Sequence, residues 1–379
     1  MNLHIGLDGS RIAKAHYTGT EHYSHQIFEQ MFRVAPHHRY TIYAPALSTK
    51  PLKTANAQVD WRIIPFPKLW THVRLSAEFL MHCHTDVLFI PSHTVPLIHP
   101  TPTVSTIHDL GFKRFPEYYS RLERVYQEFG LTQALRASTR IITFSAATKR
   151  DILHYTQFPA SKIHVIHHGV DREIFHPVDP LSKPSLRIHE YMPYLYSIGR
   201  LEAKKNTVQL LRAFRILKEK YQMPHHLVIA GTPGQYGYAE IEQVLKELPQ
   251  NTRDDIHLLG YLSDQAHATW LRFASCLVFV SGFEGFGLPI VEAMASGIPV
   301  VASNISSMPE IVGPAGILVN HTRAEAIAEG ILPLLKRQYV QKSLQSKGLE
   351  RAKQFSWERA ALTTVGVLES AVQEVRNAH

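Results

Sequence analysis

Short apolar runs alternate with longer amphipathic stretches along the whole chain. The short runs are rich in Val, Ile, Leu, Phe and Tyr, which is typical of buried strands, whereas the longer stretches repeat their apolar residues at helical spacing. The predicted strands of the first half are 2–8, 39–44, 86–90, 103–108, 140–144 and 162–166, and the predicted helices are 20–34, 71–82, 118–137 and 145–154. Such strand–helix alternation predicts an α/β fold with a doubly wound parallel sheet.

The alternation stops after residue 166 and begins again near residue 193. The proline-rich stretch between them has no periodicity and is typical of a linker. The second set of predicted strands is 194–199, 226–230, 256–259, 276–280, 299–302 and 316–319, with helices at 206–221, 238–246, 264–273, 289–296, 323–337, 340–354 and 357–377. We therefore predict an N-terminal domain of residues 1–170, a linker of 171–192 and a C-terminal domain of 193–356. Two such sheets facing across a cleft would place a ligand site between the domains.

The charge of the chain narrows the class of partner. Forty Lys and Arg residues against 32 Asp and Glu residues give a net charge of +8. The excess is spread along the sequence without a block of five like charges, which argues against a nucleic-acid partner. A mild positive field is still compatible with phosphorylated small molecules or with an anionic membrane surface.

Cysteine content and hydropathy predict a cytoplasmic location, with peripheral contact at the inner face of the membrane left open. Cys83 and Cys276 cannot form a disulfide framework. No apolar run approaches the roughly 18 residues of a spanning helix, and the first residues lack the pattern of a signal peptide. The metal-like cluster His82-Cys83-His84 has no second ligand pair at a suitable spacing, so we expect no metal site.

A glycine-rich loop follows the predicted strand 276–280. Its glycines, Gly282, Gly285 and Gly287, permit positive φ, and Pro289 suits the first position of a helix. The loop therefore presents backbone N–H groups at a helix N-terminus, which is a site suited to phosphate.

Two carboxylates accompany this loop: Glu284 lies within it, and Glu292 is expected in the first helical turn. Carboxylates beside a phosphate accept hydrogen bonds from neutral donors such as sugar and ribose hydroxyls. The alternative is that Glu284 is a solvated loop residue and Glu292 a partner of the helix dipole.

Basic residues follow the predicted strand 194–199. Gly199 opens a turn, Arg200 comes next, and Lys205 stands just before a helix, so both cations could meet one pyrophosphate. By itself this segment is more typical of an ordinary basic loop. Gly231 begins a further glycine turn after the next strand. Neither half contains a dinucleotide fingerprint or a Walker-type lysine loop.

These motifs together resemble the retaining nucleotide-sugar glycosyltransferases with two Rossmann-like domains (GT-B), in the family 4 group that carries a Glu-x7-Glu motif. The resemblance covers nearly all of the second domain, from Gly199-Arg200 through 284–292 and 295–303 to 316–319. In the first half, 17–23 resembles the glycine loop of the family, with Glu21 where a second glycine is common.

The resemblance implies a nucleoside-diphosphate sugar as donor, with GDP-mannose slightly favoured over a UDP-sugar. It implies transfer with retention to a saccharide or lipid-linked acceptor, without a metal or other cofactor, by a hexosyltransferase. The implied catalytic residues are Glu284, His108, Arg200 and Lys205; the implied donor-binding residues are Gly19, Gly199, Gly231, Gly285, Phe286, Gly287, Leu288 and Glu292; and Asp109 is implied on the acceptor side. The last helix, 357–377, is implied to pack back on the first domain.

Two other classes stay open, as does the oligomeric state. A nucleotide-sugar epimerase on the same scaffold should lack the Glu284/Glu292 pair in this form, and a phosphorylase would need a pyridoxal-phosphate lysine and a much longer chain. A non-catalytic sugar-nucleotide sensor would keep Glu292 but tolerate loss of Glu284 and His108. The aromatic and basic segment 61–74 is predicted to be a packed loop, with contact to an anionic bilayer as the alternative.

Overall fold

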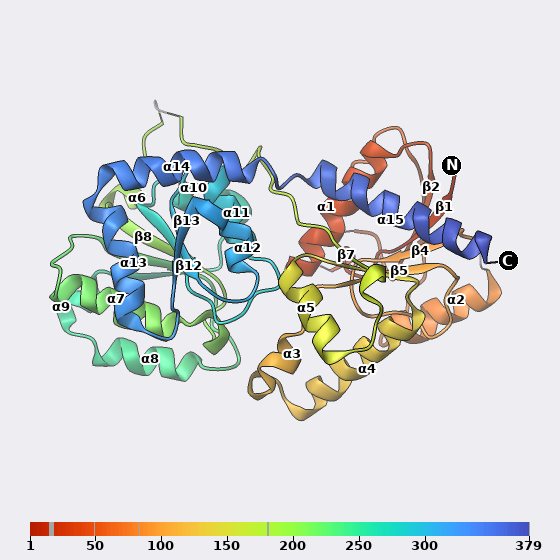
Figure 1. The fold of residues 1–379 in the computed structure, drawn as a ribbon, viewed down its shortest axis with the longest axis horizontal. Helices are drawn as coiled ribbons and strands as arrows, with labels where there is room; N and C mark the ends of the chain where they lie inside the picture. The colour runs from red at the N-terminus through yellow and green to blue at the C-terminus, as the bar shows by residue number, and fades with distance from the viewer. Residues whose placement is uncertain (15–18, 49, 83, 180–181, 379) are drawn as a thin grey trace. The chain divides into compact units, whose positions relative to one another are not determined.

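A computed structural model describes residues 1–14, 19–48, 50–82, 84–179 and 182–378. Cys83, like Tyr17 and Thr18 of the predicted glycine loop, lies outside the described residues. The chain divides into two units, which Figure 1 shows as two separate sheet-and-helix bodies. Unit 1 comprises Met1–Gly169 and Ser356–His379, and unit 2 comprises Val170–Phe355.

Unit 1 is built on a seven-stranded sheet in which every strand pair is parallel. The strand order is β3-β2-β1-β4-β5-β6-β7, so the order reverses between β1 and β4. The strands are β1 (His4–Asp8), β2 (Arg39–Ala44), β3 (Gln58–Ile63), β4 (Val87–Ile90), β5 (Thr103–Ile107), β6 (Arg140–Thr143) and β7 (Ile163–Val165). The helices are α1 (Gly19–Val34), α2 (Ser76–Met81), α3 (Gly111–Arg114), α4 (Arg121–Ala137), α5 (Ala146–Tyr155) and α15 (Trp357–Asn377).

Unit 2 repeats this arrangement with six parallel strands in the order β10-β9-β8-β11-β12-β13. Its order reverses between β8 and β11. The strands are β8 (Tyr194–Ile198), β9 (His226–Ala230), β10 (Ile256–Gly260), β11 (Cys276–Phe279), β12 (Val300–Ser303) and β13 (Gly316–Val319). The helices are α6 (Leu186–Glu190), α7 (Thr207–Glu219), α8 (Tyr238–Glu247), α9 (Gln250–Asp254), α10 (Asp264–Arg272), α11 (Leu288–Ala295), α12 (Met308–Val312), α13 (Ala324–Lys336) and α14 (Gln338–Ala352).

The burial of the strands explains why most of them could be predicted from the sequence. Strands β4, β5, β11 and β12 are buried along their whole length, as expected for strands of a parallel sheet that is covered on both faces. The predicted fold class, two Rossmann-like doubly wound parallel sheets, is confirmed.

Strand β3 was missed in the sequence analysis. Its residues are half-buried or exposed, because it pairs only with β2 at the edge of the sheet and lacks a continuous apolar run. It takes in the start of the aromatic and basic segment 61–74. Further along that segment Trp70 is buried and donates its indole N–H to the carbonyl of Ile64 (2.7 Å), whereas Leu69 is 60% exposed. The segment is thus partly packed and partly on the surface.

The C-terminal helix α15 packs against α1, so unit 1 is made of two separated parts of the chain. The apolar face of α1 includes Ile27, Phe28 and Met31, and that of α15 includes Val365 and Leu368, all buried. The predicted linker 171–192 belongs to unit 2 and contains the short helix α6.

Candidate active site

The motif residues of unit 2 gather at its switch point. Strands β8 and β11 are neighbours and run parallel, so the segments that follow them leave the same edge of the sheet. Gly199, Arg200 and Lys205 follow β8, and the loop 281–287 follows β11. The crevice outside the carboxyl ends of strands at a switch point is where ligands bind in doubly wound sheets.

The structure brings Lys205 and Glu284 together. Lys205 Nζ lies 2.5 Å from Glu284 Oε1, and the two side chains are 20% and 16% exposed. The same Nζ lies 5.5 Å from the centroid of the Phe279 ring. A Cβ on Gly199, whose φ is +151°, would meet the Lys205 side chain at 3.3 Å. Gly199 therefore leaves room for the lysine that reaches the carboxylate.

Two serines that the sequence analysis missed hold the loop of Glu284. Ser306 Oγ donates to the carbonyl of Glu284 (2.6 Å). Ser307 is fully buried, and its Oγ lies 2.9 Å from the same carbonyl and 2.7 Å from that of Phe286. Both serines follow β12, so a neighbouring strand end fixes the loop. No sequence signal identified them, because these contacts join residues more than 20 positions apart.

The loop ends at Gly287, whose φ of +102° places it in the left-handed region at the N-cap of α11. Of the three loop glycines that permit positive φ, only Gly287 adopts it. Pro289 is the second residue of the helix rather than the first. The first N–H groups of α11 have no acceptor within the helix, which gives Gly287 and Leu288 the character of an anion site.

Glu292 lies one turn into α11, not in its first turn as predicted. It is buried, with 8% exposed. Its Oε2 lies 3.1 Å from Nε2 of His267, and Nδ1 of that histidine lies 2.9 Å from the hydroxyl of Tyr196. Neither partner was predicted from the sequence.

Arg200 is placed differently from Lys205. Its side chain is 57% exposed, and its nearest acidic partner among the described residues is Glu202, 3.9 Å away. No described contact joins Arg200 to the Lys205–Glu284 pair. The adjacent Gly231 has a packing reason of its own, since a Cβ there would lie 1.9 Å from the carbonyl oxygen of Gly199.

Asn206, which follows β8, forms hydrogen bonds with the segments that follow β11 and β13. Its backbone is left-handed (φ +60°), and its Nδ2 donates to the carbonyls of Val280 (3.0 Å) and His321 (2.7 Å). Because it follows Lys205 directly, it fixes the position from which the lysine side chain extends.

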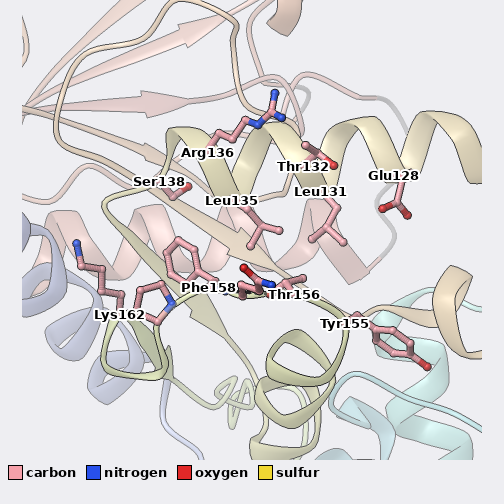
Figure 2. Close-up of a pocket in the computed structure, with 12 residues that line it drawn as sticks. Glu128, Leu131, Thr132, Leu135, Arg136, Ser138, Tyr155, Thr156, Phe158 and Lys162 are labelled. Atoms are coloured by element: carbon pink, nitrogen blue, oxygen red, sulfur yellow. Dashed lines mark hydrogen bonds between the residues drawn. The ribbon is translucent and has the colours of Figure 1, made fainter.

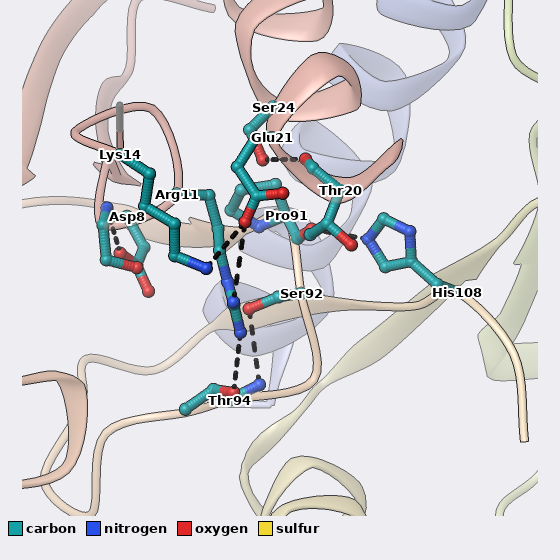
Figure 3. A network of polar contacts seen from close by, with 11 residues as sticks. Asp8, Arg11, Lys14, Thr20, Glu21, Ser24, Pro91, Ser92, Thr94 and His108 are labelled. Carbon is teal, nitrogen blue, oxygen red and sulfur yellow. Dashed lines mark hydrogen bonds and ion pairs between the residues drawn. The ribbon is translucent and has the colours of Figure 1, made fainter. Parts of the chain in front are cut away.

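In unit 1, His108 directly follows β5 and lies close to the end of β4. Its Nε2 lies 2.9 Å from the carbonyl oxygen of Pro91, as Figure 3 shows. A carbonyl only accepts, so Nε2 carries the proton and Nδ1 is the acceptor of the ring. Burial lowers the pKa of His108 to about 4, and the ring is therefore neutral at pH 7.

A polar network surrounds the start of α1 (Figure 3). Glu21 is buried and accepts a hydrogen bond from Lys14 Nζ (2.8 Å), while Arg11 Nη1 lies 3.8 Å away. Glu21, which stands where the family often has a second glycine, thus lies beside two cations. Neither cation was predicted from the sequence. Gly19 begins α1, and a Cβ there would meet nothing within 4 Å.

Asp109 accepts the backbone N–H of Gly111 (2.8 Å) and so supports the start of α3. It also lines a cavity of about 190 Å³ beside His108. The residues that line this cavity are Arg11, Thr20, Ser92, His93, His108, Asp109, Phe112, Tyr119 and Gln127.

A larger cavity of about 720 Å³ lies elsewhere in unit 1, between α4 and the segment after α5 (Figure 2). Ser138 and Lys162 line it, and they precede β6 and β7. It therefore opens at the amino ends of those strands, whereas ligands of doubly wound sheets bind at the carboxyl ends. It contains none of the predicted site residues.

Within the described residues, one group of possible metal ligands comes together: His37, His38 and Glu369 have ligand atoms within 4.8 Å of one another. Nδ1 of His38 accepts the backbone N–H of Leu3 (3.1 Å). The ring proton then sits on Nε2, the atom that would have to bind a metal. This arrangement suits an interaction of Nε2–H with Glu369 better than a metal site. In the described part of the chain, no helix has the length and apolar content needed to cross a bilayer.

The fold defines a protein with two doubly wound parallel-sheet domains, and comparison with known proteins gives its family. Residues 179–353 match the family described as glycosyl transferases group 1, and residues 19–174 match glycosyltransferase family 4. The chain is 31% identical over 265 residues to the O-antigen chain mannosyltransferase B of Escherichia coli, covering 69% of this chain and 68% of the relative. It is also 31% identical over 288 residues to an MMP alpha-(1->4)-mannosyltransferase of Mycolicibacterium hassiacum, covering 72% of this chain and 66% of the relative.

Solved structures share the fold at lower identity. Anabaena HepE in complex with UDP-glucose has a TM-score of 0.75 at 19% identity and covers 97% of this chain and 100% of its own. Sucrose-phosphate synthase from Thermosynechococcus elongatus has a TM-score of 0.73 at 18% identity and covers 99% and 100%. The chain belongs to the family 4 glycosyltransferases, is an enzyme that transfers a sugar, and has the GT-B fold.

Proposed function

We propose that this glycosyltransferase moves a hexose from a nucleoside-diphosphate sugar, with GDP-mannose favoured, to a saccharide or lipid-linked acceptor, with retention of configuration and without a divalent metal. The observation that carries the proposal is the Lys205–Glu284 pair at the switch point of unit 2, beside the N-terminus of α11. Support for mannose comes from the two mannosyltransferases among the similar proteins. Support for a nucleotide-sugar donor comes from HepE, which binds UDP-glucose.

The leaving diphosphate gains negative charge as the bond to the sugar breaks. Lys205, the exposed guanidinium of Arg200 and the N–H groups of Phe286, Gly287 and Leu288, where the loop enters α11, supply positive charge and donors at one sheet edge. Such preorganised donors stabilise developing charge without a metal. Gly199, Gly231 and Gly285 let the backbone come close to the donor, and Gly19 does so at the start of α1.

Glu284 holds the hydroxyls of the donor sugar. Lys205 already occupies Oε1, so the carboxylate is fixed in position. Glu292 holds the ribose hydroxyls. His108 contacts the donor sugar through Nδ1, which accepts a hydroxyl hydrogen bond because Nε2–H is given to Pro91.

The acceptor saccharide enters the cavity of about 190 Å³ that Asp109 lines. Its lining offers both donors, such as Arg11 and Gln127, and an acidic acceptor, so it can bind the hydroxyls of a sugar from several sides.

The test begins with a thermal-shift screen of nucleoside-diphosphate sugars, in which the true donor should raise the unfolding midpoint most. Transfer by that donor is then measured with and without excess EDTA, and the anomeric configuration of the product is read by NMR. Full activity in EDTA and a retained anomer are expected. Loss of activity in EDTA would overturn the metal-free mechanism. A protein that binds the donor but neither transfers the sugar nor slowly hydrolyses the donor would be a sugar-nucleotide sensor instead.

We also propose that α4 contacts an anionic membrane, where a lipid-linked acceptor would lie. Leu122, Val125 and Phe129 follow one another at helical spacing and are 83%, 69% and 48% exposed. Arg121 and Arg124 flank them. An apolar helical stripe bordered by arginines is typical of an interfacial helix.

Sedimentation with phosphatidylglycerol-containing vesicles tests the membrane contact. The double substitution Leu122→Glu/Val125→Glu should abolish binding, and added salt should weaken the binding of wild type. Leu362→Glu on α15 is the matched control, because Leu362 is similarly apolar and 53% exposed. Equal loss in the control, or none in the double variant, would contradict the proposal.

A further inference from the structure

Three buried polar side chains from three elements of unit 2 form one row. Tyr196 lies on β8, His267 on α10 and Glu292 on α11. The hydroxyl of Tyr196 is 2.9 Å from Nδ1 of His267, and Nε2 of His267 is 3.1 Å from Oε2 of Glu292. The three residues are 0%, 5% and 8% exposed.

The direction of both hydrogen bonds follows from the chemistry of the ends. A carboxylate only accepts, so Nε2 of His267 carries the ring proton and donates to Glu292. Nδ1 then has a lone pair and accepts from Tyr196. Burial raises the pKa of Tyr196 well above its ordinary value, so its hydroxyl remains a donor. The row thus fixes one tautomer of His267.

The histidine is also held by packing. The ring of Tyr196 lies 5.6 Å from that of His267 at an interplanar angle of 18°, and the ring of Phe175 lies 5.3 Å away. Its own backbone N–H donates to the carbonyl of Ser263, whose Oγ caps α10. His267 therefore has its position before any ligand binds.

This row leaves one carboxylate oxygen of Glu292 for a ligand. Oε2 is occupied by His267, and no hydrogen bond within the described residues engages Oε1. We propose that His267, oriented by Tyr196, is a positioning residue that turns Oε1 of Glu292 toward the ribose hydroxyls of the donor and thereby sets the affinity of the enzyme for the nucleoside. This inference rests on the proposed function, in which Glu292 holds the ribose.

The competing explanation is that His267 only fills space in the core. Leucine would fill that space as well and would leave Glu292 without its donor. A packing role and a positioning role therefore differ in one property: only the positioning role couples residue 267 to the ribose hydroxyls.

Isothermal titration calorimetry measures this coupling. The probes are GDP and its 2′,3′-dideoxy analogue, with UDP and its 2′,3′-dideoxy analogue in parallel. The variants are then compared with whichever of GDP and UDP wild type binds more tightly, together with the dideoxy analogue of that nucleotide. Wild type should bind the hydroxylated nucleotide at least about tenfold more tightly, because a hydrogen bond to a charged group is lost with the hydroxyls. His267→Leu should reduce that preference to about twofold or less while affecting the dideoxy analogue little.

Two gentler variants keep the test decisive if His267→Leu does not fold. His267→Gln keeps a side-chain N–H that can reach Glu292 and should retain most of the preference. Tyr196→Phe removes only a hydroxyl and should lower the preference by severalfold. If wild type does not discriminate between the two nucleotides, the ribose role of Glu292 fails. If wild type discriminates and the substitutions leave the preference unchanged in folded protein, the positioning role fails while the proposed function stands.

Discussion

Removing the positive end of the Lys205–Glu284 pair tests the active site most directly. We consider Lys205→Met, which keeps an unbranched side chain of similar length and removes the charge. In the structure Nζ lies 2.5 Å from Glu284 Oε1, with both side chains about four-fifths buried. The substitution leaves a largely buried carboxylate without its cation.

Two magnitudes follow from this geometry. A hydrogen bond between charged groups contributes about 1.5–3 kcal/mol, so the unfolding free energy of unit 2 should fall by about 2 kcal/mol. For a domain of this size that corresponds to a midpoint lower by roughly 4–8 °C. Loss of one fixed donor that stabilises developing charge typically lowers kcat about 10²–10³-fold, so activity should fall far more than the stability loss would suggest.

The assay follows release of nucleoside diphosphate at saturating donor, alongside thermal unfolding. The double variant Lys205→Met/Glu284→Gln separates the two effects, because neither charge is then left alone and stability should largely return. Activity should stay low. A kcat for Lys205→Met within a few-fold of wild type, or a return of activity together with stability in the double variant, would refute the role of Lys205 in leaving-group stabilisation.

Further predictions concern stability and pH. Gly231→Ala should lower the unfolding free energy of unit 2 by about 3 kcal/mol or more, because the added Cβ would lie 1.9 Å from the carbonyl oxygen of Gly199. Gly19→Ala should leave the urea midpoint unchanged, because its added Cβ would meet nothing within 4 Å. Equal effects of the two substitutions would contradict this packing argument. Burial lowers the pKa values of His108 and His225 to about 4, so the folded state binds fewer protons than the unfolded state between about pH 4 and 6.5, and stability should fall as the pH drops through that window. The unfolding free energy should fall by at most about 1.4 kcal/mol per pH unit for each histidine. Urea unfolding at several pH values should show that this free energy depends less steeply on pH in His108→Asn than in wild type. Since the ring of His108 stays neutral, its protonation should not lower kcat between pH 6 and 8.

The sequence predicted the elements whose pattern is local. Strands β2, β9 and β13 have the predicted bounds, because an apolar run is recognised without knowledge of the rest of the fold. Strand β3 was missed because an edge strand is half-exposed and its residues, Gln58–Ile63, mix polar and apolar types. Lys205 and Glu284 each follow a predicted strand closely. Because the carboxyl ends of parallel strands lie at the same edge of the sheet, this position indicated that the two residues lie at one edge.

Contacts across long stretches of chain could not be predicted. Ser307 beneath the loop of Glu284 and His267 against Glu292 are ordinary residues in the sequence. Each gains its role from a neighbour that the fold supplies. A periodicity argument gives the element on which a residue lies, but it does not identify which side chain of another element will face it.

The return of α15 to unit 1 has a consequence for how the protein is made on the ribosome. Trp357, Ala361, Val365 and Leu368 of α15 are buried in unit 1, whose other residues end at Gly169. Unit 2 can complete its core once Phe355 has emerged, whereas unit 1 must wait with the apolar face of α1 uncovered until α15 emerges. A chain that stops before α15 would therefore leave the first-made half unfinished, and a chaperone would have most reason to bind there.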